Sequence, residues 1–252
     1  DVIDNSATAI NYCPLTGTAF GWKGFVRNSD TTFGVSGLLY NTNLILYDRN
    51  TDSNWSQLKL ECVNGQQIGD KPETISVVET NWGTWKDMFP STKVLSLDTG
   101  FNRNYGVYPY GDYITNHDFL LFNVSPLNNL LPKKERVFAV IDQTQSKVYR
   151  FSDFAEGKVI KDSFNGKNYL IAGNQNVINA FKLTGEFLDL EFNYSFNNSE
   201  GFFIDSENNK WNIFGHAIDG ARTGQMLSPS KSVTSYWFAI AAFYYNPIIY
   251  TD

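Results

Sequence analysis

Two cysteines and two histidines are the residues of this 252-residue sequence best suited to nucleophilic or metal chemistry: Cys13, Cys62, His117 and His216. A catalytic cysteine needs a base to take its proton and a positive environment to hold the thiolate. Neither histidine lies in a recognisable catalytic motif, so we interpret both as surface or hydrogen-bonded structural residues. A zinc site would need all four side chains, without the paired spacing typical of zinc ligands. We therefore assign no catalytic residue, no metal ligand and no cofactor.

Cys13 lies in a strand-like run, AINYCPLTGTAFGW, directly before a proline-glycine turn. A free cysteine behaves as a small hydrophobic residue and is often buried. We interpret Cys13 and Cys62 as structural, either as buried free thiols or as a disulfide, and the sequence does not choose between these. A disulfide closing that loop would stabilise the fold by about 4 kcal/mol on the chain-entropy model.

Side chains suited to ligand binding gather in two stretches, 46–57 and 96–135. Arginine offers a planar fork of donors to paired oxygens, and tyrosine offers flat contact area with a polar tip. We expect a cleft between these stretches in which Arg49 or Arg103 receives an anionic or polyhydroxyl ligand. The residues predicted to line it are Asp48, Arg49, Trp55, Gln57, Arg103, Tyr105, Tyr110 and Tyr113. The alternative is a connection that only covers the core and packs its tyrosines there.

The elements that would position these residues occur twice. Gly65 and Gly220 stand 155 positions apart, and so do Trp82 and Trp237. A collinear series of matches at one separation indicates an ancestral duplication. We predict two repeats and a connection between them: repeat one at 1–95, an unduplicated connection at 96–135 and repeat two at 136–252.

The predicted fold class is α+β, dominated by antiparallel strands, with one short helix in each repeat. Apolar residues at i, i+3 and i+7 predict the helices. They are Trp82, Trp85 and Phe89 in repeat one, and Trp237, Ile240 and Tyr244 in repeat two. Thr80 is placed to cap the first helix, and Thr234 or Ser235 the second. Runs of β-branched and aromatic residues between Asn-Gly and Asp-Gly turns predict the strands.

A strand-like run at 136–151 opens repeat two and has no counterpart in repeat one. When 161–169 is aligned with 1–12, Asp162 falls opposite Asp1. Repeat one therefore lacks a segment of about two dozen residues, the size of a strand pair with its turn. We expect the matching edge of repeat one to be open, or filled by a strand from the missing N-terminal segment or from another chain.

Composition limits the partners and the location. A net charge of −6 and a pI near 5.0 argue against nucleic acid as a partner. The most apolar run, 236–245, is too short to span a bilayer. Asparagine-rich turns, few lysines and arginines, and several glycosylation sequons are typical of an exported protein. We expect a periplasmic or extracellular location.

Four blocks of the sequence carry a family resemblance: YCPLTGTA, FGVSGLLYNTNLILYDRNTDSNWSQL, DTGFNRNYGVYPYGDY and WNIFGHAIDG. Together they resemble, over nearly the whole chain, a widespread prokaryotic family known only as domain of unknown function 3179. The resemblance implies no established activity. It does imply relatives that begin further upstream with a segment containing His-Glu-Ile, and many with a second cysteine three positions after the first. Thr16 occupies that position here, so this chain has no Cys-x-x-Cys motif.

We predict an uncharacterised exported bacterial protein that acts as a non-catalytic module. It would bind a small ligand or a protein partner in a cleft between two duplicated halves. Two alternatives stay open: a cysteine- or metal-dependent enzyme centred on Cys13, and a structural component of a cell-surface assembly. Stoichiometric metal in the full-length protein would favour the enzyme.

Overall fold

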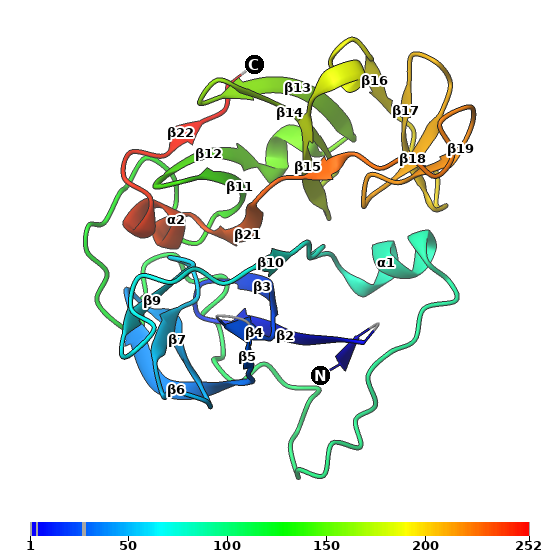
Figure 1. Ribbon diagram of the computed structural model, residues 1–252. Coiled ribbons are helices and arrows are strands. Elements are labelled where there is room, and N and C mark those ends of the chain that lie inside the picture. The colour runs from blue at the N-terminus through cyan, green and yellow to red at the C-terminus, as the bar shows by residue number, and fades with distance from the viewer. Residues whose placement is uncertain (1, 4, 27–28, 252) are drawn as a thin grey trace.

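Strands make up most of the ordered structure, with the N-terminal strands in the lower part of Figure 1 and the C-terminal strands in the upper part. The computed structural model describes residues 2–3, 5–26 and 29–251. In these residues the strands form five four-stranded sheets and one two-stranded ribbon, accompanied by two short α-helices. Pairing within the described sheets is antiparallel, apart from the short parallel contact of β12 with β22. The predicted predominance of antiparallel strands is confirmed.

The N-terminal half contains two four-stranded sheets, ordered β1-β2-β3-β10 and β6-β7-β8-β9, and the ribbon β4-β5. Helix α1 follows them. The elements are β1 (Val2–Ile3), β2 (Ser6–Cys13), β3 (Thr18–Lys23), β4 (Phe25–Val26), β5 (Ser29–Asp30), β6 (Phe33–Tyr40), β7 (Asn43–Asp48), β8 (Asn54–Ser56), β9 (Glu61–Asn64), β10 (Thr74–Ile75) and α1 (Trp82–Met88). Asp1, which the sequence aligns with Asp162, lies outside the described residues.

The C-terminal half contains three four-stranded sheets, ordered β21-β11-β12-β22, β13-β14-β15-β20 and β16-β17-β18-β19. Its elements are β11 (Arg136–Asp142), β12 (Gln145–Arg150), β13 (Lys158–Phe164), β14 (Lys167–Gly173), β15 (Ile178–Leu183), β16 (Phe192–Tyr194), β17 (Gly201–Asp205), β18 (Lys210–Asn212), β19 (Ala217–Asp219), β20 (Ser228–Pro229), β21 (Ser232–Tyr236), α2 (Trp237–Phe243) and β22 (Ile248–Ile249). Two 3₁₀ turns, 151–154 and 185–188, link some of them. The strand structure predicted at 136–151 is present as β11 and β12.

The sheets β6–β9 and β16–β19 share a local arrangement. In each, an aspartate ends the second strand and accepts a hydrogen bond from a tryptophan indole in the third. Trp55 donates to Asp48 at 3.0 Å, and Trp211 donates to Asp205 at 2.9 Å. The same carboxylates accept backbone N–H groups from the turn that follows, so each aspartate fixes a turn as well as a strand.

The glycines that match in sequence also match in conformation. Gly65 has φ 101° and Gly220 has φ 100°, in the left-handed region that disfavours side chains. A Cβ at Gly65 would clash with Ser53, and one at Gly220 would clash with Asn209. Gly65 directly follows β9 and Gly220 directly follows β19, in each case the fourth strand of its sheet. Both positions therefore require glycine, because the backbone has a positive φ and because a neighbouring residue leaves no room for a Cβ.

Each helix packs mainly in a core built around the opposite half of the molecule. The buried face of α2 joins a cluster that includes β2, β3, β7 and β8, and Tyr244 donates its O–H to the Leu58 carbonyl at 2.7 Å. Helix α1 places Met88 in the cluster formed by β14, β15, β17 and β18. Trp85 and Phe89 pack there against Phe214. This reciprocal packing joins the two halves.

The helices begin where the periodicity predicts, at Trp82 and Trp237, but their details differ from prediction. The cap of α1 is Asn81, whose side chain accepts the Thr84 N–H at 2.8 Å, whereas the Thr80 hydroxyl is buried without a described partner. Helix α2 has no side-chain cap. Trp82 is 54% exposed and does not line the packed face.

Residues 96–135 form no helix or strand in the structure and run along the outside of the molecule (Figure 1). Lys134 anchors the end of this connection. Its ammonium group donates to the carbonyls of Tyr113, Asn116 and Phe119, and it lies 3.5 Å from the centre of the Tyr113 ring. One buried cation therefore donates to three loop carbonyls and holds them together.

Candidate functional site

Asp48 and Trp55, predicted to line a ligand cleft, are buried side chains that bind each other. The Asp48 carboxylate accepts hydrogen bonds from the Trp55 indole, the Thr51 hydroxyl and two backbone N–H groups. Burial by itself would raise the pKa of Asp48, but these hydrogen bonds together outweigh it and hold the pKa below its usual value. The oxygens of this carboxylate are therefore occupied by donors of the protein itself.

Gln57 is also buried, at the centre of a polar network between the β2–β3 hairpin and β7–β8. Its carbonyl oxygen accepts from the Thr18 hydroxyl at 2.6 Å and from the Asn43 amide at 2.8 Å. Its amide nitrogen donates to the Asn11 side chain at 2.7 Å. Arg49 is exposed, but its guanidinium group donates to Thr32 and to the Phe33 carbonyl.

The predicted residues of the connection lie apart from this first set. Tyr113 is buried and donates its O–H to the Leu15 carbonyl at 2.9 Å, and its ring lies 6.4 Å from that of Tyr110. Tyr105 exchanges a hydrogen bond with Thr99, and Arg103 is exposed. Among the described residues, no hydrogen bond or ring contact links the two predicted sets.

Both cysteines are free thiols in buried positions. The Cys13 sulfur points at the Thr42 carbonyl, 3.8 Å away, and burial raises the pKa of the Cys62 thiol. The His117 ring nitrogen Nδ1 accepts the backbone N–H of Lys134 at 3.1 Å, and His216 forms a β-bridge with Met226. Within the described ranges, no group of three or more His, Cys, Asp or Glu side chains could hold a metal ion.

A pocket of about 180 Å³ lies where strands of the two halves meet. Its walls include 74–77 from the N-terminal half and 229–232 from the C-terminal half, two segments 155 positions apart. Phe20 of β3 and Lys182 of β15 complete the lining. An apolar cavity of about 150 Å³ holds a benzene molecule, so this pocket has room for a small ligand.

Two lysines line the pocket, and Asp142 is the carboxylate whose charge acts on both of them. In the described part of the chain, neither Lys182 nor Lys231 has an ion-pair partner. Desolvation lowers the pKa of Lys231, and the charges of Lys71 and Lys182 lower it further, while Asp142 opposes the shift. Asp142 is itself bound by Lys167. An anion in the pocket would relieve the repulsion among these lysines.

A hydroxyl group in the pocket also lacks a partner. The Ser230 Oγ is buried and makes no hydrogen bond to any described residue. Its backbone N–H binds the Ala180 carbonyl, which fixes the residue on the edge of β15. Buried hydroxyls are normally hydrogen-bonded, so an orphan in a pocket indicates a position where a ligand oxygen could be bound.

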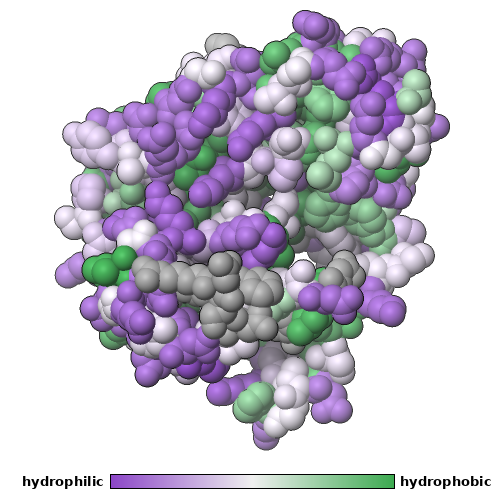
Figure 2. Space-filling view, in the orientation of Figure 1, coloured by the Kyte–Doolittle hydropathy of each residue, from purple (hydrophilic) through white to green (hydrophobic). Residues whose placement is uncertain are grey.

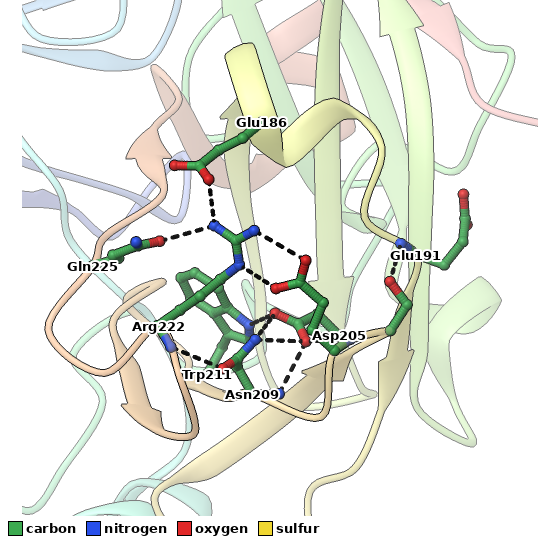
Figure 3. Close-up of polar contacts among 9 residues, drawn as sticks. Glu186, Glu191, Asp205, Asn209, Trp211, Arg222 and Gln225 are labelled. Atoms are coloured by element: carbon green, nitrogen blue, oxygen red, sulfur yellow. Dashed lines mark hydrogen bonds and ion pairs between the residues drawn. The ribbon is translucent and has the colours of Figure 1, made fainter.

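In a second charged cluster, around Arg222, the charged groups bind one another (Figure 3). The guanidinium group of Arg222 binds Glu186 at 2.8 Å, Glu207 at 2.7 Å and the Gln225 side chain. The adjacent Asp205 binds Asn209 and Trp211. These groups use their hydrogen bonds on one another. We therefore interpret the cluster as a brace for the loop that carries Gly220.

The fold and the pocket define a β-rich protein with a small basic pocket between two strand-rich halves. The chain belongs to the family described as "Protein of unknown function (DUF3179)", whose sequence model matches residues 1–247. The resemblance found in the sequence is thereby confirmed. No curated protein and no solved structure matches the chain. Among the described residues, no helix is long and apolar enough to cross a membrane.

Proposed function

We propose that this protein is a non-catalytic binding module, built from two duplicated halves, that holds a small anionic ligand in the pocket between them. The observation that carries the proposal is the meeting of three side chains at one cavity: the exposed Lys182 and Lys231, which form no ion pair among the described residues, and Ser230, whose hydroxyl is buried without a described partner. Lysine and serine donors bind phosphate and carboxylate oxygens. The pocket replaces the cleft that the sequence predicted as the ligand site.

The duplication is part of this proposal. It is supported by the paired glycines, by the two aspartate–tryptophan hydrogen bonds and by helices that begin 155 positions apart. Two sheets are also built alike: each pairs three consecutive strands and adds a strand from later in the chain beside the third. Their orders are β1-β2-β3-β10 and β13-β14-β15-β20. A pocket on the junction of two related halves is a position where one ligand can contact both.

Cys13 has no role in this proposal. Its sulfur is buried and directed at a carbonyl, and neither histidine is among its hydrogen-bond partners in the described residues. A nucleophilic cysteine needs access to substrate and a base within reach. We further propose, from the composition, an exported location, which fractionation of cells expressing the full-length protein would test.

Titration calorimetry with inorganic phosphate at low ionic strength tests the proposed ligand class. We expect saturable binding of one phosphate, weakened at least tenfold by Lys231→Ala. The matched control is Lys59→Ala, which removes an equally charged side chain paired with Glu61 outside the pocket. Equal weakening by both substitutions would indicate only a general effect of net charge, and the proposal would fail.

A further inference from the structure

The second half covers both faces of its sheet β13-β14-β15-β20. One face packs Leu170 and Phe181 into the core shared with α1. The opposite face carries Tyr169 and Ile171, which are 2% and 0% exposed. The hairpin β11–β12 covers this second face, with Phe138, Val140 and Tyr149 packed against it.

The first half leaves the corresponding face uncovered. Its sheet β1-β2-β3-β10 has the same strand order, and one face packs Cys13, Phe20 and Trp22 into a core. On the opposite face of β2, Ile10 is 57% exposed and Tyr12 is 52% exposed. Figure 2 shows hydrophobic side chains at the surface around the N-terminal strands and, across a hollow, beside α1. Further exposed apolar residues close to these elements in the sequence are Val2, Ile3, Val77 and Val94.

A strand edge beside this face is also unpaired. In the second half, β21 pairs antiparallel with β11, from Arg136↔Tyr236 to Val140↔Ser232. The stretch 155 positions earlier is 77–81, which follows β10 and pairs with no strand in the described ranges. Likewise, β22 pairs with β12, whereas its counterpart at 93–94 has no partner strand among described residues. The two segments of the first half that correspond to the partners of the β11–β12 hairpin, 77–81 and 93–94, are therefore without a partner strand among the described residues.

We propose that the outer face of β1–β2 and the edge at 77–81 accept an amphipathic β-hairpin that the same polypeptide carries ahead of residue 1. The hairpin would lie as β11–β12 lie in the second half, with alternate apolar side chains on Ile10 and Tyr12 and a backbone ladder to 77–81. This inference rests on the proposed duplication but not on the anion pocket.

We assign the hairpin to the same polypeptide because the second half connects its own hairpin directly to the sheet that the hairpin covers. There, β12 leads through residues 151–157 into β13, the strand that corresponds to β1. Strand β1 pairs with β2 at the edge of the sheet that carries the open face. A hairpin joined to β1 by a link of that length reaches the face directly, and it would be present at high effective concentration.

The chain's own hairpin provides the probe. In a chimera, residues 136–161 are repeated ahead of residue 1, which reproduces the connection of the second half. Hydrogen exchange of the amides at 77–81 is then measured in the chimera and in the original chain. We expect exchange at 77–81 to slow at least tenfold in the chimera, because a paired edge amide is protected from solvent.

Two controls make the result specific. A chimera with lysine at the added copies of Phe138 and Val140 should leave 77–81 in fast exchange, and so should Ile10→Lys in the acceptor. Unchanged exchange in the first chimera, or equal slowing in the lysine control, would overturn the proposal. Protection of 77–81 in the original chain that rises with concentration, together with a dimer mass by light scattering, would assign the face to a second copy and overturn it as well. Phosphate binding by the same proteins is a separate readout and tests only the pocket.

Discussion

The indole N–H of Trp55 donates a hydrogen bond to the buried carboxylate of Asp48 at 3.0 Å. The aspartate is not free for a ligand, because it also accepts from the turn that joins the two strands. Trp211 and Asp205 repeat the arrangement at 2.9 Å in the other half. Two polar residues that suggested a binding site in the sequence are thus part of the framework that holds each sheet together.

Asp48→Ala should lower the free energy of unfolding by about 2–4 kcal/mol, because the substitution leaves the Trp55 indole and two turn amides without an acceptor. Asp205→Ala should cost a similar amount. Urea denaturation followed by tryptophan fluorescence measures both. A loss under about 0.5 kcal/mol at either position would contradict the framework role.

The contribution of Asp48 should depend on pH with a definite sign. Its folded-state pKa is lower than the usual 3.8, since the hydrogen bonds from Trp55 and Thr51 outweigh the effect of burial. The stability from the ionised form is therefore fully present above about pH 4 and is lost as pH falls through the depressed folded-state pKa. The difference in unfolding free energy between wild type and Asp48→Asn should shrink as pH falls below 3.8 and be constant between pH 5 and 7. A difference that grows toward acid pH would have the wrong sign.

Cys13 and Cys62 should react slowly with a thiol reagent in the native protein and rapidly in urea, because both are buried. Cys13→Ala should lower stability by about 1–3 kcal/mol, as expected for loss of a small core side chain. The measurements are the rate of modification at neutral pH and urea denaturation of the variant. Rapid modification of either thiol in the folded state would show that it is accessible.

Lys134→Met should loosen the end of the connection. The substitution removes the donor shared by the carbonyls of Tyr113, Asn116 and Phe119, and we expect a loss of about 2–4 kcal/mol. Limited proteolysis should cut the variant within 110–119 faster than wild type. Lys133→Met is the matched control, and equal proteolysis of both variants would argue against the anchor.

Ser230→Ala should separate stability from binding. Without ligand, removing an unpartnered buried hydroxyl should leave stability unchanged or raise it by about 1 kcal/mol. Phosphate binding should weaken in the same variant, because a donor to the ligand is lost. Calorimetric titration and urea denaturation of one protein sample test both parts, and a stability loss without any change in binding would assign Ser230 to the core alone.

Several elements follow directly from patterns in the sequence. Helix starts at Trp82 and Trp237 follow from apolar periodicity, and the turn at Asn165-Gly166 follows from its residue types, both of which take positive φ. The helix cap was misassigned because Thr80 and Asn81 can both accept an N–H. The choice depends on which residue directly precedes the first turn.

The proposed pocket could not be predicted from the sequence, because polar residue types do not show which side chains meet in the fold. Asp48 and Gln57 look like ligand-binding residues in the sequence, yet internal donors satisfy them. Conversely, Lys182 and Lys231 lie in unremarked stretches and become neighbours only when β15 and the segment after β20 meet. The one signal available was the separation of 155 positions between 74–77 and 229–232, the same separation on which the proposed duplication rests.

The most direct test of the proposed binding function is a chemical-shift titration of the ¹⁵N-labelled protein with inorganic phosphate. The pocket predicts saturable shifts confined to 74–77, Lys182 and 229–232, which disappear in Lys231→Ala. Shifts centred instead on Arg49 or Arg103, or spread without saturation over the surface lysines, would contradict the assignment of the ligand site to the junction of the two halves.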